Sequence, residues 1–404
     1  MRTWRLLTLL FVGGLAVAWL WGRVTLVSDM FDMGVDKSVG AFQDGDCDLL
    51  LEEGVGPYGG EDVVYIGSGV YLVGGGDLQY GMKKPLSDGH PGTLYAVVDK
   101  GDRFHMRRLT VQVPEGFYFK PHGLHYSNSS GRLYVVNHAD EGVLVLQAHW
   151  RDGHPCADAA TCVEVPGGDG RRADVTALMF ETQRFVQDDI FPYGTLNDVV
   201  EGASEREFYV TQWLAVPVPE PGTLWSKILQ PIAPFLSILG EFTHVYRCEL
   251  GKEEETCEIA ASGFNMANGI TMDHATGRVF VVDGKRLHVL RRLPGGALQR
   301  VSIISTPDIL DNVEWNGDVL QAATIPSLVE ATDKMSKGLD VSVHGGLIEF
   351  REEESGVWSH RNLLVHSGDK LSMISAAVRV GESAVLGSPF SPGVLVCHHV
   401  KNMW

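Results

Sequence analysis

Residues 122–137, HGLHYSNSSGRLYVVN, and residues 268–283, NGITMDHATGRVFVVD, follow one pattern without a gap. Each stretch begins with a polar residue and a glycine. Each then reaches a Gly-Arg turn nine and ten positions after its first residue, and ends in a four-residue apolar strand. Agreement in both register and turn is typical of a repeated structural unit rather than of shared composition.

Weaker copies of this pattern recur along the chain. They begin at Glu61-Asp62, Asn197-Asp198 and Asp311-Asn312, and a sixth unit near Lys370-Leu371 lacks the polar pair. Units of this spacing suit four-stranded propeller blades with insertions, because one blade takes about 40 to 50 residues. We therefore expect an all-β chain in which residues 45–404 form a six-bladed β-propeller.

The polar residues that open the units should meet in space, because the innermost strand of each blade lines the central channel. They offer carboxylate and amide oxygens but no thiolate, and they are Glu61, Asn197, Asn268, Asp311 and Asn312. Calcium takes six to eight oxygen ligands in flexible geometry, whereas zinc prefers nitrogen and sulfur. The sequence therefore predicts a calcium ion in the channel.

Two further carboxylates, Asp62 and Asp198, directly follow members of this set. Neighbours in an extended segment point to opposite sides, so this pair would serve a second, more deeply placed ion. The alternative is that all these residues only cap turns, where Asn and Asp are common. That alternative is preferable for any single site but weaker for five sites in register.

Two histidines belong to the same unit. His122 opens it and His138 closes its strand. A lone histidine is usually a packed or exposed side chain. Two beside a metal are candidates for water activation and proton transfer, because imidazole titrates near neutral pH.

The charge balance excludes one class of partner. Across 404 residues, 33 Lys and Arg stand against 51 Asp and Glu, which gives a net charge of −18. Without a long basic run, the chain is not expected to bind nucleic acid.

The N-terminus has the character of a targeting segment. Residues 1–23 contain two early arginines and an uncharged apolar stretch at 6–22, typical of a signal peptide or signal anchor. Ala16-Val17-Ala18 offers a cleavage site, but the apolar run continues past it, which favours an uncleaved anchor. Residues 24–44 would form a linker. We expect the secretory pathway, with a propeller that is lumenal or extracellular and membrane-anchored, or secreted.

Six cysteines behind such a segment indicate disulfides, with 15 possible pairings. Cys156 with Cys162 and Cys248 with Cys257 are close enough in sequence to staple local hairpins. A bond between the remaining pair, Cys47 and Cys397, would tie the ends of the domain together. The sequon at Asn128 is a possible glycosylation site.

At these residues the chain resembles the calcium-dependent paraoxonase/arylesterase family of six-bladed propellers. The matching pieces occur in the family's order between Cys47 and Cys397. They are GGED at 59–62, KPHGL at 120–124, VVNHAD at 135–140, LNDVV at 196–200, GFNMANGIT at 263–271 and LDNV at 310–313.

The resemblance implies two calcium ions. A catalytic ion would be held by the five oxygen-bearing residues named above, and a structural ion by Asp62, Asp198 and the backbone carbonyl of Leu124. His122 and His138 match the pair proposed as general base and proton shuttle. The resemblance also implies a ring-closing disulfide from Cys47 to Cys397, a retained N-terminal hydrophobic helix, and hydrolysis of lactones and aryl esters.

The sequence departs from the family at two places. Gln212 and Trp213 stand where the family has Asn-Asp or Asn-His, and AATIP at 322–326 replaces a stretch with a cysteine and a histidine. Both changes leave the substrate preference open. They favour one alternative, a non-catalytic, calcium-stabilised binding propeller. A second alternative is a strictosidine-synthase-like propeller enzyme, which shares the six-bladed architecture.

An insertion at about 218–240 has apolar residues at helical spacing, interrupted by Pro231 and Pro234, which should break or kink a helix. The resemblance implies a helical lid that covers the active site and contacts lipid. A helix that only packs on the propeller rim is an equal alternative.

Overall fold

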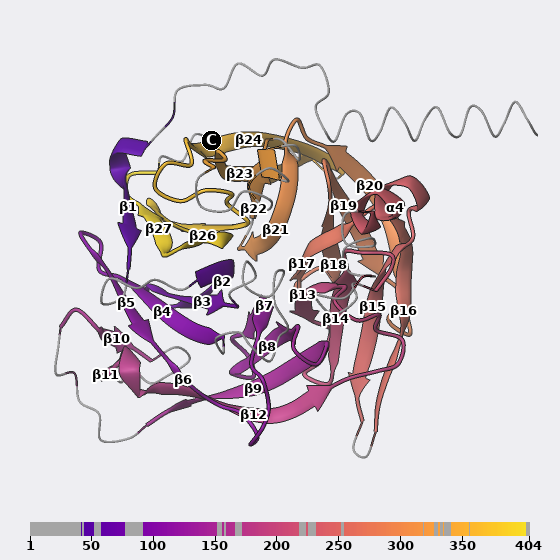
Figure 1. The fold of residues 1–404 in the computed structure, drawn as a ribbon, viewed down its shortest axis with the longest axis horizontal. Coiled ribbons are helices and arrows are strands. Elements are labelled where there is room, and N and C mark those ends of the chain that lie inside the picture. The colour runs from indigo at the N-terminus through magenta and orange to yellow at the C-terminus, as the bar shows by residue number, and fades with distance from the viewer. Residues whose placement is uncertain are drawn as a thin grey trace, which may run out of the picture.

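The computed structural model describes residues 42, 44–51, 58–76, 92–151, 156, 159–165, 172–217, 224, 232–251, 254–317, 319–326, 330–331, 334, 341–354 and 356–400. These residues form an all-β, propeller-like arrangement, and Figure 1 shows the sheets following one another around a common centre. The expected targeting segment at 1–23 and most of the expected linker at 24–44 lie outside the described residues.

Three sheets have four antiparallel strands in simple chain order. They contain β13 (Leu196–Glu201), β14 (Glu207–Gln212), β15 (Thr243–Leu250) and β16 (Glu255–Phe264); β17 (Ala267–Asp273), β18 (Arg278–Asp283), β19 (Arg286–Arg292) and β20 (Leu298–Ser305); and β21 (Ile309–Asn316), β22 (Val319–Ile325), β23 (Gly345–Glu354) and β24 (Val357–His366).

A fourth large sheet has the order β6-β12-β9-β8-β7. Its strands are β7 (Pro121–Ser127), β8 (Arg132–Asn137), β9 (Gly142–Trp150), β12 (Leu178–Val186) and β6 (Thr110–Gln112), of which β6 pairs parallel to β12. A small sheet, β10 (Cys162–Glu164) with β11 (Arg172–Asp174), lies outside it, and short 3₁₀ turns occur at Asp44–Asp46 and Val175–Ala177.

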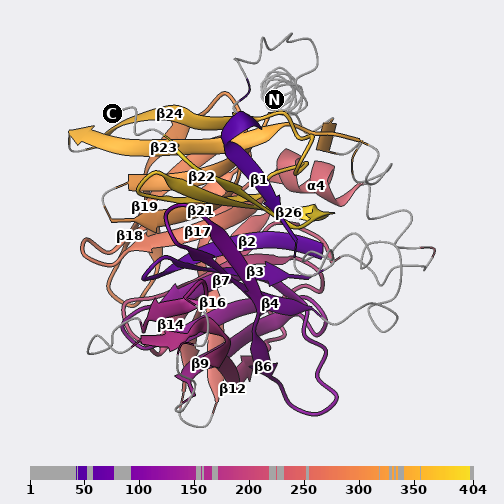
Figure 2. The same ribbon diagram turned by 90° about the vertical axis from the view of Figure 1, so that its left-hand side faces the viewer.

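The remaining strands form one eight-stranded sheet. The sequence predicted six separate blades for the whole propeller, so this merged sheet departs from the prediction. It contains β1 (Cys47–Leu50), β2 (Tyr58–Gly67), β3 (Val70–Gly75), β4 (Thr93–Asp99), β5 (Phe104–Arg108), β25 (Ala376–Val380), β26 (Ser383–Pro392) and β27 (Val394–Cys397). The cause of the merger is a short pairing between β2 and β26, at Tyr58 with Pro392 and Gly60 with Ser388. This contact joins the first and last parts of the ring, as the two views in Figures 1 and 2 show.

The first strand of each repeat lies innermost. Each of these strands contacts the next in the order β2, β7, β13, β17, β21 and β25, and β25 contacts β2 again, so the innermost strands close a ring. Five of the repeats identified in the sequence begin on these strands, whereas the sixth, predicted near Lys370-Leu371, begins before β25. The two strongest copies share their turn geometry, because Gly131 and Gly277 have φ angles of 67° and 69°, which glycine adopts without steric cost.

The core lies between neighbouring sheets. For example, Val136 and Val143 of one sheet pack with Val199 and Phe208 of the next, and all four side chains are fully buried. Strands covered on both faces explain why the sequence shows short continuous apolar runs rather than a strict alternation.

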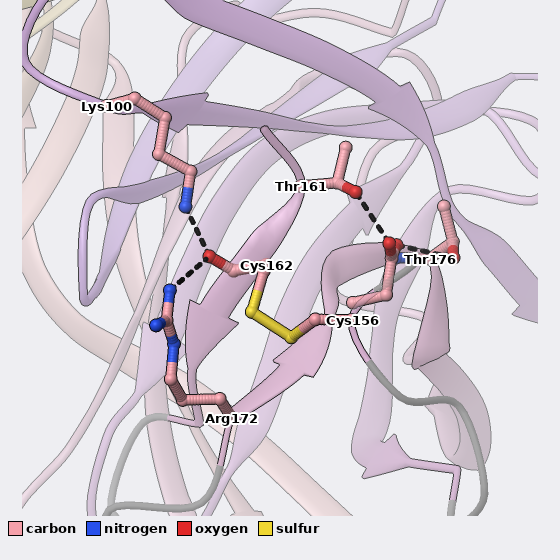
Figure 3. Close-up of a disulfide and its surroundings, with 7 residues drawn as sticks. Lys100, Cys156, Thr161, Cys162, Arg172 and Thr176 are labelled. Carbon is pink, nitrogen blue, oxygen red and sulfur yellow. Dashed lines mark hydrogen bonds between the residues drawn. A yellow bond between two sulfur atoms is a disulfide. The ribbon is translucent and has the colours of Figure 1, made fainter. Parts of the chain in front are cut away.

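All three expected disulfides are present. Cys47 and Cys397 face each other across β1 and β27, and Cys248 and Cys257 join β15 to β16. The third bond joins Cys156 to Cys162, the first residue of β10 (Figure 3).

Hydrogen bonds around this third disulfide connect it to the residue that follows β4 and to β11. Lys100 and Arg172 both donate hydrogen bonds to the carbonyl of Cys162. Thr161 donates to Asp174, which also caps the turn at Val175–Ala177.

One described helix, α4 (Ala233–Gly240), lies within the expected insertion. It carries Pro234 in its first turn, the part of a helix where proline removes no helical hydrogen bond, so the helix is not broken there; Pro231 lies outside the described residues. The Ser237 hydroxyl accepts a hydrogen bond from the backbone of Ala215, which anchors α4 close to the end of β14. None of the helices among the described residues is long and apolar enough to cross a bilayer.

Candidate functional site

The polar residues predicted to meet do lie on the innermost strands, near where each strand begins: Glu61 on β2, His122 on β7, Asn197 on β13, Asn268 on β17, and Asp311 and Asn312 on β21. Contacts join distant members of this set directly. The Asn312 amide donates to the backbone carbonyl of Glu61 at 2.9 Å and to its Oε2 atom at 3.1 Å. His122 Nδ1 lies 3.1 Å from Glu61 Oε2. Residues 251 positions apart in the sequence therefore share one polar cluster.

Two glycines let the innermost strands approach closely enough to form this cluster. A Cβ atom on Gly123 would lie 2.4 Å from the carbonyl oxygen of Asn197, and one on Gly269 would lie 2.6 Å from Cα of Asn312. Both distances are well inside van der Waals contact. The glycine that follows the polar residue in each strong repeat is thus required by the strand next to it.

Four oxygens of this set are buried without a hydrogen-bond partner, namely Oδ1 of Asn197, Asn268, Asp311 and Asn312. Buried polar atoms are normally paired, because leaving one unpaired costs about 1–3 kcal/mol. Here four such oxygens come from three neighbouring strands, and together they could serve as ligands to one metal ion. They fit a divalent cation with oxygen ligands, and the role of each residue as a ligand remains a prediction.

Asp62 and Asp198 have a different environment from the first set. Asp62 accepts backbone hydrogen bonds from Val63 of its own strand at 2.8 Å and from Leu124 of β7 at 2.7 Å. Asp198 does the same with Val199 and with Ile270 of β17, both at 2.7 Å. Each carboxylate therefore fastens one innermost strand to the next. Leu124 contacts Asp62 through its backbone N–H. The role of its carbonyl as a calcium ligand stays a prediction.

The carboxyl groups of the channel raise one another's pKa values. Burial, and then the neighbouring Asp311 and Asp62, hold the pKa of Glu61 well above its usual range. Burial raises the pKa of Asp62 and of Asp311 to about 7. Burial and the Asp62 charge likewise raise the pKa of Asp198. No described lysine or arginine forms an ion pair with these groups, so a bound cation would relieve a repulsion that the described side chains leave uncompensated.

His122 and His138 are in direct contact, with ring centroids 4.5 Å apart and nearly perpendicular planes. His122 Nδ1 lies 3.0 Å from the backbone carbonyl of Asn197, which can only accept, so Nδ1 carries the proton and Nε2 is the basic nitrogen. Burial and then the neighbouring His138 hold the pKa of His122 well below its usual range, which keeps the imidazole neutral.

Two residues that the sequence did not single out extend the site. Glu141 contacts His138 Nδ1 at 3.2 Å, and its only sequence signal is its position three residues after that histidine. Glu314 lies further along β21, and burial with the charges of Asp62 and Asp198 raises its pKa well above the usual range. Alternation along β21 could not have found it, because the pairing with β22 shifts register between Leu310 and Val313.

The two departures from the family are structurally accounted for. Gln212 is buried, accepts from the Tyr246 hydroxyl at 2.7 Å and donates to the Leu214 carbonyl at 2.7 Å, so it braces the chain that leaves β14. Residues 322–325 are all buried within β22. Gln212 and residues 322–325 are therefore part of the packed interior.

No protein-family model matches this sequence, and no curated protein matches it. Among solved structures, the chain is similar to a luciferin-regenerating enzyme, with 11% identity over 85% of this chain and 92% of that chain and a TM-score of 0.44. It is similar to a calcium-binding protein, regucalcin, from Agrobacterium tumefaciens, with 11% identity, coverage of 86% and 92%, and a TM-score of 0.42. It is also similar to virginiamycin B lyase from Staphylococcus aureus, with 10% identity, coverage of 87% and 98%, and a TM-score of 0.42.

Proposed function

We propose that this chain is a calcium-dependent hydrolase of lactones and aryl esters, similar to the paraoxonase/arylesterase family and built on a six-bladed propeller. The closed ring of innermost strands supports the blade count, with the eight-stranded sheet read as two blades joined by the contact of β2 with β26. The observation that carries the function is the group of four unpartnered buried oxygens close to the paired histidines.

Two calcium ions are proposed. Glu61, Asn197, Asn268, Asp311 and Asn312 would hold the first, and Asp62, Asp198 and the Leu124 carbonyl the second. When bound, the first ion would polarise a carbonyl group and stabilise negative charge on its oxygen. Amide and carboxylate oxygens without thiolates are the donors that calcium prefers.

The histidine pair would handle the proton. Neutral His122 takes a proton from water at Nε2 while Nδ1 stays bonded to the Asn197 carbonyl. Hydroxide adds to the carbonyl carbon, and the bond from that carbon to the ester oxygen then breaks. The leaving oxygen regains a proton through His138, which Glu141 holds in place. The products are a carboxylic acid and a phenol from an aryl ester, or a hydroxy acid from a lactone.

We also propose that the insertion near α4 contacts a lipid surface. Leu224, Ile232 and Leu236 are exposed large apolar side chains within this segment, and exposed Phe242 follows it. The insertion follows β14, and the Trp213 N–H just after β14 donates to the carbonyl of Thr195 just before β13. The insertion therefore starts at the end of the sheet where β13 begins. An anchor or secreted form in the secretory pathway agrees with the three disulfides.

The function is tested with the purified full chain and a panel of aliphatic lactones and phenyl acetate, in calcium and after chelation. We expect turnover that needs calcium and falls at least a hundredfold in His122→Gln. The matched control is His149→Gln, since His149 is an exposed histidine of β9 that pairs with Glu181 away from the channel. Equal activity of His122→Gln and the control would overturn the assignment of the base.

A calcium-stabilised binding propeller is the second candidate. The strand-to-strand bonds of Asp62 and Asp198 favour it, because they give the channel carboxylates a structural purpose without catalysis. A folded protein that binds calcium but turns over no member of the panel would establish this candidate instead.

A further inference from the structure

A second cluster of metal-binding side chains lies at the opposite ends of the same innermost strands. It consists of His125 on β7, Glu201 at the end of β13 and His274 directly after β17. One ligand atom from each residue lies within 4.8 Å of the others. Figure 1 shows β7, β13 and β17 as neighbours around the centre, so the cluster joins three successive sheets.

The cluster opens onto a pocket. A cavity of about 550 Å³ is lined by all three residues together with Ser127, Glu314 and others. Glu201 is buried and His274 is exposed at the mouth. His125 Nε2 is a buried nitrogen without a hydrogen-bond partner. Buried polar atoms are normally paired, so an imidazole nitrogen without a partner beside a buried carboxylate is a candidate metal ligand.

Neighbouring side chains hold the carboxylate in place. The Ser127 hydroxyl donates to Glu201 Oε2 at 2.6 Å, and the Tyr134 hydroxyl donates to Oε1 at 3.2 Å. Metal-binding carboxylates are commonly fixed by such outer hydrogen bonds, and each oxygen keeps a lone pair for a further contact. The acidic ligand of this cluster is thus oriented before any ion arrives.

The donor types select the metal. Two imidazoles and one carboxylate suit zinc, which takes three protein ligands and leaves a fourth position for water, whereas calcium prefers oxygen throughout. We propose that His125, Glu201 and His274 bind a zinc ion at a site separate from the channel's oxygen cluster. Zinc ligands lie about 2.0–2.2 Å from the metal, so the three ligand atoms, which lie within 4.8 Å of one another, must approach more closely when zinc binds.

A simpler explanation covers only part of the cluster. Glu201 alone could serve as the acceptor for Ser127 and Tyr134 across two sheets. That role leaves His125 Nε2 buried without a partner and gives no reason for His274 to face the same carboxylate. A shared ion accounts for all three residues.

The test is a zinc titration of the full chain after chelation and return to excess calcium, with a chromogenic chelator as competitor. Wild type should take up one equivalent of zinc more than His274→Gln does, because the variant lacks one of the three proposed ligands. His274 is exposed, so this variant is expected to fold, and His149→Gln is the matched control. Cobalt(II) should give visible absorption bands in wild type and in the control alone.

Melting temperatures give a readout independent of activity. Zinc should raise the melting temperature of wild type and of His149→Gln, and leave that of His274→Gln unchanged, because only an ion bound to the folded state stabilises it. Equal zinc affinity in all three proteins, or no saturable zinc uptake in the presence of calcium, would overturn the proposal.

Discussion

Glu141 Oε2 lies 3.2 Å from Nδ1 of His138, and the Oε1 atom of the same carboxylate accepts hydrogen bonds from the backbone N–H groups of Thr195 and Leu196. Glu141 thereby holds His138 against the start of β13, where Thr195 and Leu196 directly precede Asn197. Glu141→Gln keeps an oxygen for the two backbone donors but replaces the acceptor for His138. We expect kcat on the best lactone to fall roughly tenfold to a hundredfold, with KM nearly unchanged.

The control for this variant is Glu181→Gln, which removes a half-exposed carboxylate paired with His149. Its kinetic constants should equal those of wild type. Circular dichroism must show that both variants are folded. A parallel rise in KM, or a loss of folded protein in Glu141→Gln alone, would mean that Glu141 supports the β13 segment rather than the proton path.

Much of the fold could be predicted because its determinants are local and repeated. The Gly-Arg turns at Gly131 and Gly277 require a left-handed glycine, and the apolar runs after them form β8 and β18. The polar pairs before them fall on the innermost strands, so the cluster of Glu61 with His122 and Asn312 follows from the repeat.

What could not be predicted depends on contacts between distant segments. The joining of β2 with β26 has no sequence signal of its own, because it arises where the last strands meet the first. Glu141 lies in a turn, and its partners Thr195 and Leu196 are more than fifty residues away. The cluster of His125, Glu201 and His274 was missed because its members stand at strand ends, outside the repeated polar pairs.

The two kinds of channel residue should respond differently to truncation. Asp198→Ala removes the acceptor for two buried backbone N–H groups, those of Val199 and Ile270, and should cost roughly 2–4 kcal/mol of unfolding free energy. Asn268→Ala removes an unpartnered oxygen and a single hydrogen bond to Asp311, so stability in chelator should fall by only about 1 kcal/mol. Calcium affinity and turnover should nevertheless fall at least tenfold.

Urea unfolding in chelator and calorimetric titration of calcium separate these outcomes. The comparison needs no further control, because each variant serves as the reference for the other. Equal losses of stability in Asp198→Ala and Asn268→Ala would contradict the proposal that Asn268 serves to bind the ion and Asp198 to hold neighbouring strands together.

The close approach of β17 and β21 predicts a large effect from one methyl group. A Cβ on Gly269 would lie 2.6 Å from Cα of Asn312 and from the Val313 nitrogen, which are backbone atoms that cannot rotate away. Gly269→Ala should therefore cost roughly 1–3 kcal/mol of stability and weaken calcium binding, because the strands that carry the oxygens move apart. Gly45→Ala is the control, since nothing lies within 4 Å of its added Cβ. Unchanged melting and calcium affinity in Gly269→Ala would show that the strands tolerate a wider spacing.

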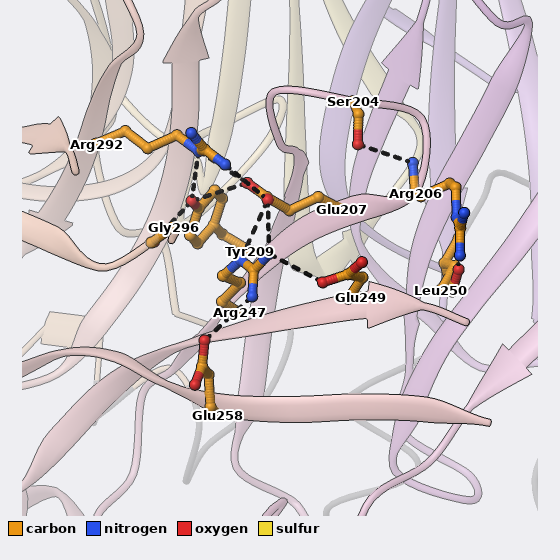
Figure 4. Close-up of polar contacts among 10 residues, drawn as sticks. All are labelled: Ser204, Arg206, Glu207, Tyr209, Arg247, Glu249, Leu250, Glu258, Arg292 and Gly296. Carbon is orange, nitrogen blue, oxygen red and sulfur yellow. Dashed lines mark hydrogen bonds and ion pairs between the residues drawn. The ribbon is translucent and has the colours of Figure 1, made fainter. Parts of the chain in front are cut away.

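Glu207 predicts a specific pH dependence of stability. Figure 4 shows its carboxylate between Arg247 and Arg292, with bonds of 3.0 Å and 2.8 Å and a further contact to the Tyr209 hydroxyl. Burial alone would raise its pKa, but the hydrogen bonds from Arg292 and Arg247 hold the pKa at about 2. A carboxyl whose folded pKa is depressed contributes stability above its ordinary pKa, and that contribution is lost as the pH falls toward the folded value.

Glu207→Gln should therefore lower the free energy of unfolding by roughly 1–3 kcal/mol at pH 7. The difference from wild type should shrink steadily below the ordinary pKa of 4.5 and approach zero near pH 2. Urea unfolding of both proteins at several pH values in this range measures it. Glu258→Gln is the control, because its exposed carboxylate also contacts Arg247 and an exposed pair contributes little. A difference between wild type and Glu207→Gln that stayed constant with pH would show that the glutamate acts through packing, since only its charge titrates across this range.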